Sequence, residues 1–324
     1  MYLIGELHGV QENEEILHEY LSRLYSDAGL REVAIEEDSV YEPAAQAYVD
    51  GRSSALPPAL CLRAGALQAL RAFNEGKRSD PVRVRLVDID SPATAIRQHL
   101  LAIKEQAPGA DAVHLPPVAE LEARGMETVA ALRALGLSQP QLSQLRTIEK
   151  SIRAYQQGLE VGTTSGFKGS PYLDDREEAI TSNILEMVRT DGGRSVLVQY
   201  GSDHVSRSLR RDGGPDRNRA FSPLARRLAG AGVKVFSLMT VPLSGRWSWR
   251  GRDGEMFWAP NDGHLADGAG FDQVFAEAPD AKWLYVDRAR QRVTLPSTDM
   301  TAYDVDAYLL FTEAIPMENH CSAP

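Results

Sequence analysis

An apolar strand that ends in a glutamate, a histidine and a glycine opens this chain: Tyr2-Leu3-Ile4-Gly5-Glu6-Leu7-His8-Gly9. Residues i and i+2 of a strand lie on the same side, so Glu6 and His8 are expected to project together beyond the strand. A carboxylate beside an imidazole orients the ring and raises its basicity, as a general base requires. The same spacing also arises when a glutamate merely caps a histidine at a strand end.

Further β-branched and aliphatic runs alternate with amphipathic helical patterns, which indicates strand–helix–strand crossovers. The predicted fold is therefore α/β: a largely parallel mixed sheet with helices on both faces. Ligands bind beyond the carboxyl ends of the strands in such sheets. The predicted strands are Tyr2–Gly5, Glu32–Glu36, Val82–Val87, Ser195–Tyr200, Val233–Met239, Lys282–Val286 and Ala307–Phe311, and the first three predicted helices are Glu14–Tyr25, Pro58–Asn74 and Ala93–Gln106.

Residues 93–169 show no strand pattern and are expected to form several helices, among them Pro117–Leu135 and Gln139–Gln157. We predict a single α/β domain over residues 1–324, with residues 93–169 as a helical insertion that lids the strand ends. A separate helical domain is the alternative. The segment Gly245–Gly270, rich in Gly, Trp and Asp, is expected to be irregular loop.

A second polar cluster follows the apolar strand that ends at Tyr200, in the turn Gly201-Ser202-Asp203-His204. The strand-end rule places His204 in the same crevice as His8. The other histidines lie in predicted helices, loops or the tail, and we interpret them as surface or structural residues.

Carboxylates crowd the predicted strand ends, at Glu36-Glu37-Asp38 and at Asp88-Ile89-Asp90. With Glu6 they would repel one another unless a cation, a shared proton or an arginine lies among them. Arg71 and Arg176 are the candidate countercharges, and either could instead clamp a substrate carboxylate.

Composition excludes several other classes of protein. The chain has 35 basic and 45 acidic residues, a net charge of −10, which argues against a nucleic-acid-binding surface. No apolar run approaches the roughly 18 residues that span a membrane. The start shows no secretory pattern, and Cys61 and Cys321 match no redox or metal spacing, so we expect unpaired cysteines and a cytoplasmic protein. Serine-hydrolase, Walker, dinucleotide-binding and zincin motifs do not occur.

Gly5-Glu6-Leu7-His8-Gly9, Ala34-Ile35-Glu36 and the turn ending at His204 together resemble the erythromycin esterase / ChaN-like / Tiki superfamily. Two further segments resemble motifs of the esterase branch, Leu70–Asn74 and Val82–Asp90. Asp175–Ile184 is similar to a helix of the family, and Val305–Phe311 is similar to its last strand. The resemblance thus touches nearly the whole chain. Two departures are visible: Glu6-Leu7-His8 follows the ChaN and Tiki spacing, and Gly201 stands where the esterases usually carry another histidine.

The resemblance implies that His8 activates water with support from Glu6. It also implies that Glu36, Arg71 and Asp90 surround the site, with His204 on the opposite wall. ChaN-type members are associated with haem and the membrane, and Tiki-type members depend on a divalent metal.

Our leading hypothesis is a metal-independent hydrolase, or a tailoring enzyme with the same acid–base centre, acting on a small bacterial metabolite. In this hypothesis Glu6, His8 and His204 are catalytic, and Glu36, Arg71, Asp90 and Arg176 bind substrate. No cofactor is favoured. The alternatives are a haem- or metabolite-binding protein without turnover, and a hydrolase that holds a divalent metal between Glu6, His8 and His204.

Overall fold

A computed structural model describes most of the chain: residues 1–89, 93–160, 170–190, 194–211, 220–250, 256–260, 275–276, 278–290 and 303–317. Asp90, one of the expected substrate-binding residues, lies outside these ranges, as does Cys321.

A mixed sheet of seven strands forms the centre of the molecule, in the order β10-β11-β7-β1-β4-β2-β3. All neighbouring strands are parallel except β10, which runs antiparallel to β11. The predicted fold class is confirmed. The strands are β1 (Tyr2–Glu6), β2 (Glu32–Asp38), β3 (Arg83–Asp88), β4 (Val196–Gly201), β7 (Phe236–Pro242), β10 (Trp283–Asp287) and β11 (Ala307–Phe311).

Apolar clusters lie on both faces of this sheet, because alternate residues of each strand point to opposite sides. In β1, Leu3 belongs to one cluster and Ile4 to the other. The Leu3 cluster includes residues of α7 (Ser170–Thr190) and α8 (Leu224–Gly230). The Ile4 cluster includes residues of α1 (Glu12–Asp27), α2 (Glu42–Val49) and α3 (Ala64–Glu75). Helices therefore pack on both faces, as the alternating pattern predicts.

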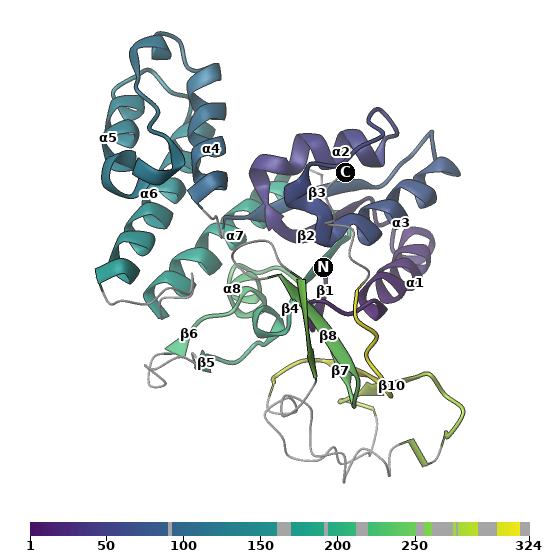
Figure 1. The fold of residues 1–324 in the computed structure, drawn as a ribbon. Helices are drawn as coiled ribbons and strands as arrows, with labels where there is room; N and C mark the ends of the chain where they lie inside the picture. Colours follow the sequence, from purple (N-terminus) through teal and green to yellow (C-terminus); the bar gives the residue numbers. More distant parts are fainter. Residues whose placement is uncertain are drawn as a thin grey trace.

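Three helices between β3 and α7 pack on one another: α4 (Ala93–Gln106), α5 (Leu121–Arg133) and α6 (Gln139–Glu160). Figure 1 shows them grouped together beside the sheet. They enclose a third apolar cluster, which includes Ile96, Leu132 and Ile148 and contains no residue of the sheet. The described part of this insertion, residues 93–160, contains no strand.

The insertion contacts the carboxyl ends of β2 and β3. His99 of α4 pairs with Asp38, and the Ser151 hydroxyl of α6 donates to the carbonyl oxygen of Ile89 at 3.4 Å. These contacts place the insertion at the edge where ligands bind in such folds. Its role as a lid is a proposal that rests on this placement.

Short elements complete the fold. The 3₁₀ helices are η1 (Ser39–Tyr41), η2 (Pro58–Arg63), η3 (Ala110–Ala112), η4 (Val118–Glu120) and η5 (Ser202–Val205). Two small antiparallel ladders pair β5 (Arg210–Arg211) with β6 (Ala220–Phe221) and β8 (Arg246–Arg250) with β9 (Met256–Pro260). The expectation of irregular loop is therefore wrong for β8 and β9.

The structure bears on two expectations drawn from composition, the absence of a membrane span and the unpaired cysteines. Among the described residues, no helix combines the length and the apolarity needed to cross a bilayer. Cys61, in η2, is disulfide-bonded, so the expectation that the cysteines stay unpaired is wrong. The cysteines therefore give no support for a reducing compartment.

Candidate active site

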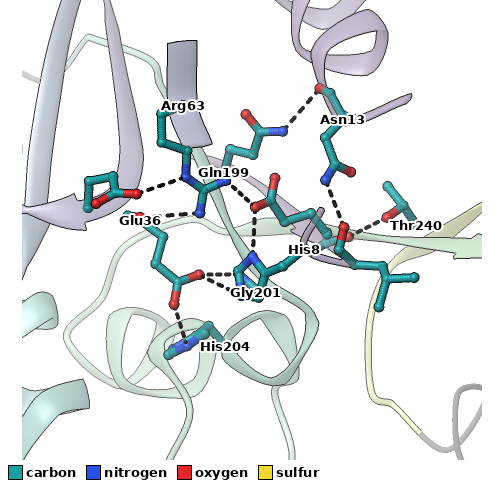
Figure 2. A network of polar contacts seen from close by, with 12 residues as sticks. His8, Asn13, Glu36, Arg63, Gln199, Gly201, His204 and Thr240 are labelled. Atoms are coloured by element: carbon teal, nitrogen blue, oxygen red, sulfur yellow. Dashed lines mark hydrogen bonds and ion pairs between the residues drawn. The ribbon is translucent and has the colours of Figure 1, made fainter. Parts of the chain in front are cut away.

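The carboxyl ends of β1, β4 and β2 meet at one place, because β4 lies between the other two strands. Glu6 is opposite Gly201 in the β1–β4 register, and Ile35 is opposite Gln199 in the β2–β4 register. The residues that follow these positions therefore come together beyond the sheet edge, as Figure 2 shows. Strand order thus brings residues from distant parts of the sequence together at this edge.

Glu6 and His8 form a hydrogen-bonded pair. Nδ1 of His8 donates to Oε1 of Glu6 at 3.0 Å. The Glu6 residue is 1% exposed, whereas the side chain of His8 is 39% exposed. The ring therefore rests on a buried carboxylate and can be reached from solvent.

The backbone around His8 is fixed by buried polar side chains (Figure 2). The Asn13 amide donates to the carbonyl oxygen of Leu7 at 2.8 Å, and the Thr240 hydroxyl donates to that of Gly5 at 2.9 Å. Gln199 in turn donates to the carbonyl oxygen of Asn13 at 3.1 Å. The strand exit that carries His8 is thus held from α1, β4 and β7.

Glu36 lies at the centre of the site, between two imidazoles. Its Oε2 is 3.5 Å from Nε2 of His8, and its Oε1 is 3.5 Å from Nε2 of His204. The backbone N–H of Gly201 donates to Oε2 at 2.6 Å, and Arg176 donates to Oε1 at 2.7 Å. The carboxylate is therefore fixed by a backbone amide and a guanidinium while it faces both rings.

His204 forms a second carboxylate–imidazole pair, through its Nδ1, with Glu177 of α7. The residue is 7% exposed, and its ring packs edge-on against Tyr200 at 5.2 Å between centroids. The site thus contains two pairs, Glu6–His8 and Glu177–His204, on either side of Glu36. One pair is open to solvent and the other is enclosed.

A steric constraint explains why glycine stands at position 201. A β-carbon at this position would lie 2.7 Å from Nε2 of His8 and 3.3 Å from Oε2 of Glu36. Any larger residue would displace His8 or Glu36. Because His8 occupies this space, the histidine that the esterases usually carry at this point does not fit here.

Comparison with known proteins shows which solved structures share this architecture. No known protein-family model and no curated protein sequence matches the chain. A mutant of the erythromycin esterase EreC, solved in its open conformation, matches with a TM-score of 0.69 at 12% identity, covering 98% of this chain and 91% of that one. The chain shares the fold of this erythromycin esterase.

Two other structures share this erythromycin esterase fold. A Bacillus cereus protein matches with a TM-score of 0.61 at 15% identity, over 98% of this chain and 90% of its own. A protein described as a succinoglycan biosynthesis protein matches with a TM-score of 0.62 at 11% identity, over 97% and 88%. At identities this low, the likeness shows the fold alone, and the chemistry of the site depends on the side chains of this chain.

Two arginines neutralise the carboxylates of this esterase-fold site. Arg63 of η2 donates to Oε1 of Glu6 at 2.5 Å, to the carbonyl oxygen of Glu36 at 3.2 Å and to Glu37 at 3.4 Å. Arg176 of α7 bridges Glu36 and Asp88, donating from Nε to Asp88 Oδ1 at 3.0 Å. Mutual repulsion of the carboxylates is relieved by these side chains, as such a cluster requires.

The two histidines have pKa values displaced upwards. Burial by itself lowers the pKa of His8, but the carboxylates of Glu36 and Glu6 outweigh it and raise the pKa above its ordinary value. Burial also lowers the pKa of His204, and Glu177 with Glu36 overrides it, holding the pKa well above the ordinary value. The protonated form is thus favoured in both rings, and more strongly in His204 than in His8.

The carboxylates between them have pKa values displaced downwards. Burial raises the pKa of Glu36, but His8, His204 and Arg176 together hold it well below its usual range. Burial likewise raises the pKa of Glu6, and Arg63 with His8 brings it below its ordinary value. Both carboxylates are therefore ionised at neutral pH.

The structure brings together most of the residues singled out from sequence. Glu6, His8, Glu36, Arg176 and His204 all belong to the cluster. Asp90 lies outside the described residues.

Arg71 is in a different place. Its guanidinium donates to the carbonyl oxygens of Tyr48 and Ser53 and lies 4.9 Å from the centroid of the Tyr48 ring. The expected place of Arg71 as countercharge to the carboxylates is therefore wrong. It tethers the chain after α2, and Arg63 is the countercharge.

Three contributors were missed: Arg63, Glu177 and the bridging role of Asp88. The sequence gives one indication that Arg63 has a partner: it is the single charged residue in the apolar run Leu60–Leu67. A charge is seldom buried in such a run without a partner. Glu177 follows Arg176 directly, and nothing in the sequence distinguishes it from its acidic neighbours.

The donors of this site do not fit a metal ion. Within the described part of the chain, no group of three or more His, Cys, Asp or Glu side chains is placed to hold one. The oxygens of Glu36 already accept from Gly201 and Arg176, and Oε1 of Glu6 accepts from Arg63 and His8. The guanidinium groups of Arg63 and Arg176 thus already neutralise Glu6 and Glu36.

Glu37 provides a test of these electrostatics. Burial, only partly offset by Arg63, raises the pKa of Glu37 to about 7. A carboxyl that holds its proton more tightly when folded stabilises the fold at low pH, and that contribution is lost as the pH rises through 7. We expect Glu37→Gln to stabilise the protein by about 1 to 3 kcal/mol at pH 8 and hardly at all at pH 4.

Urea unfolding of wild type and variant at both pH values measures this difference. Glu42→Gln, on a half-buried carboxylate outside the cluster, is the matched control. A gain from Glu37→Gln that is equal at both pH values would contradict the assignment.

Proposed function

We propose that the chain is a metal-independent hydrolase that cleaves an ester or amide of a small metabolite with the acid–base centre Glu6, His8 and His204. The observation that carries the proposal is the arrangement of two glutamate–histidine pairs on either side of Glu36, one open to solvent and the other enclosed. Such pairs with opposed environments are how one site supplies a base and an acid together.

His8 is the proposed base. Its Nδ1–H is engaged by Glu6, so Nε2 is the nitrogen that takes a proton from water. Glu6 fixes the tautomer and stabilises the imidazolium that forms, and Arg63 keeps Glu6 ionised. The exposure of His8 supports the assignment, because the base has to meet both water and substrate.

His204 is the proposed acid. As an imidazolium on Glu177 it can stabilise negative charge on the carbonyl oxygen or donate a proton to the leaving group. Glu36 faces both rings and raises the pKa of each, while Glu177 adds the larger upward effect on His204 and so favours the protonated form of that ring. The same acid–base pair could serve cyclisation, in which a group of the substrate replaces water as the nucleophile. It could also serve dehydration, in which the base removes a C–H proton and the acid protonates the hydroxyl that leaves as water.

The pH dependence of turnover tests this assignment. His8 acts in its neutral form and has a raised pKa, so kcat/KM is expected to rise with pH through a limb above the ordinary histidine value of about 6.5. It is expected to fall again at higher pH, when His204 loses its proton. Activity on a panel of esters and amides, followed by mass spectrometry, is expected to survive exhaustive chelation.

Loss of activity on chelation, with recovery on adding Mn²⁺ or Zn²⁺, would overturn the metal-free mechanism. Failure to turn over any member of the panel, together with stoichiometric haem binding, would instead favour a binding protein. Glu6→Gln is the internal check, because removing its charge should move the rising limb to lower pH.

A further inference from the structure

The end of β2 carries three consecutive acids, each of which faces a nitrogen donor from a different element. Glu36 faces Arg176 of α7 at 2.7 Å, and Glu37 faces Arg63 of η2 at 3.4 Å. Asp38 faces His99 of α4. The first two donors come from elements that line the site. The third comes from the helical insertion and has no part in the proposed chemistry.

His99 is buried, at 3% exposure, and both of its ring nitrogens are engaged. The Gln144 amide of α6 donates to Nδ1 at 3.0 Å, which leaves Nε2 as the donor to Asp38. One imidazole thus joins two helices of the insertion to the end of a catalytic strand.

The end of β2 needs such support, because its ladder with β3 is irregular. The register shifts between Ile35 and Asp38, so Glu36 and Glu37 are not held by regular pairing with β3. Asp38 is 5% exposed, and its Oδ1 also accepts from the backbone N–H of Val40 at 3.2 Å. Asp38 is therefore a fixed point immediately after the two acids of the site.

We propose that His99 is a positioning residue, which anchors Asp38 and thereby holds Glu36 midway between the imidazoles of His8 and His204. His99 touches none of the reacting groups and acts through the strand. The role rests on the proposed function for its effect on turnover, but its effect on the geometry around Glu36 is independent of turnover.

The contact of His99 with Asp38 also links the insertion to the end of β2, where Glu36 lies. The polar contacts of His99 reach α6 on one side and β2 on the other. A displacement of α4 or α6 is therefore transmitted to Asp38, two residues from Glu36, through one buried ring.

His99→Leu is the decisive variant, because leucine keeps apolar volume and removes both hydrogen bonds. Two readouts are followed, the NMR titrations of the His8 and His204 rings and the steady-state kinetics. We expect the pKa of His8 to fall toward its ordinary value, because Glu36 is no longer held 3.5 Å from Nε2. We expect kcat to fall about 10- to 100-fold with little change in KM, as for a displaced catalytic group. The charged groups that face His8, which are Glu6, Glu36 and Arg63, are unchanged in this variant.

His99→Gln tests rescue, since its amide can still donate to Asp38, and it should recover most of the His8 titration and of kcat. His114→Gln, on an exposed histidine of the same insertion, is the control and should leave both readouts unchanged. If His99→Leu does not fold, the double variant Asp38→Asn/His99→Leu removes the buried charge and carries the same expectation. The groups around Asp38, which are Glu37, Tyr41 and Asp88, are kept in every variant.

A folded His99→Leu protein with an unchanged His8 titration would overturn the proposal. If wild type turns over no substrate, the proposed function fails. The titrations then still decide whether His99 positions Glu36.

Discussion

Replacing His8 with asparagine is expected to lower kcat/KM by about 10²- to 10⁴-fold, the usual contribution of a general base. Asparagine can keep a hydrogen bond to Glu6 but cannot accept a proton from water. The His8 side chain is 39% exposed, so its loss should leave the thermal midpoint almost unchanged. Kinetics on the preferred substrate of the ester and amide panel, with calorimetry on the same samples, measure both quantities.

The matched control is His18→Asn, which alters an exposed histidine of α1. It should leave kcat/KM and the thermal midpoint at wild-type values. Undiminished turnover in His8→Asn would remove His8 from the mechanism, whatever the control shows.

Arg63→Met is expected to destabilise the protein by about 3 to 5 kcal/mol, as the loss of one partner of a buried ion pair generally does. Arg63 is the arginine that pairs with Glu6, whose side chain is fully buried, and it also contacts Glu37 and the Glu36 backbone. Without the guanidinium, Glu6 is a buried carboxylate that retains only the hydrogen bond from His8. The free energy of unfolding in urea measures the loss.

Arg71→Met is the control for this experiment, since the same substitution eight residues on removes contacts with uncharged groups, which are two backbone carbonyls and the Tyr48 ring. Adding Glu6→Gln should restore much of the stability lost in Arg63→Met, because the unpaired buried charge disappears. The same addition should not restore Arg71→Met. Equal behaviour of the two arginine variants in the Glu6→Gln background would contradict the assignment of Arg63 as the countercharge.

The strand ends were predictable because burial has a period of two and parallel strands share one edge. These two facts are enough to predict from sequence that Glu6, Glu36, His8 and His204 lie at one edge of the sheet. The sheet itself followed from the apolar runs, and Ala307–Phe311 was predicted with its observed bounds.

The sequence did not show that Arg63, and not Arg71, is the countercharge, because it did not show that a 3₁₀ helix precedes α3. The sequence predicts one helix over Pro58–Asn74, and Arg71 as a candidate countercharge to the carboxylates. The segment Pro58–Arg63 instead winds as a 3₁₀ helix, with about 3.0 residues per turn, before α3 begins. Arg63, the last residue of this 3₁₀ helix, donates to Glu6, and Arg71 of α3 donates to the chain after α2.

Contacts between residues far apart in the chain also could not be predicted from the sequence. Arg176 meets Glu36 across 140 positions, and His99 meets Asp38 across 61. Acids and bases are common enough at the surface that neither pairing has a local signature. The β8–β9 ladder did leave one, because Arg246-Trp247-Ser248-Trp249-Arg250 alternates aromatic and polar residues as a strand does.

The three helices of the insertion bury their apolar residues among themselves and not against the sheet. In evolutionary terms, such a unit can accept substitutions on its outer surface, and even changes in length, while the frame that carries His8, Glu36 and His204 is inherited intact. Residues 93–160 are then the part of the molecule that can diverge while the packing of the sheet is kept. The contact that such divergence has to preserve is the imidazole of His99 on Asp38.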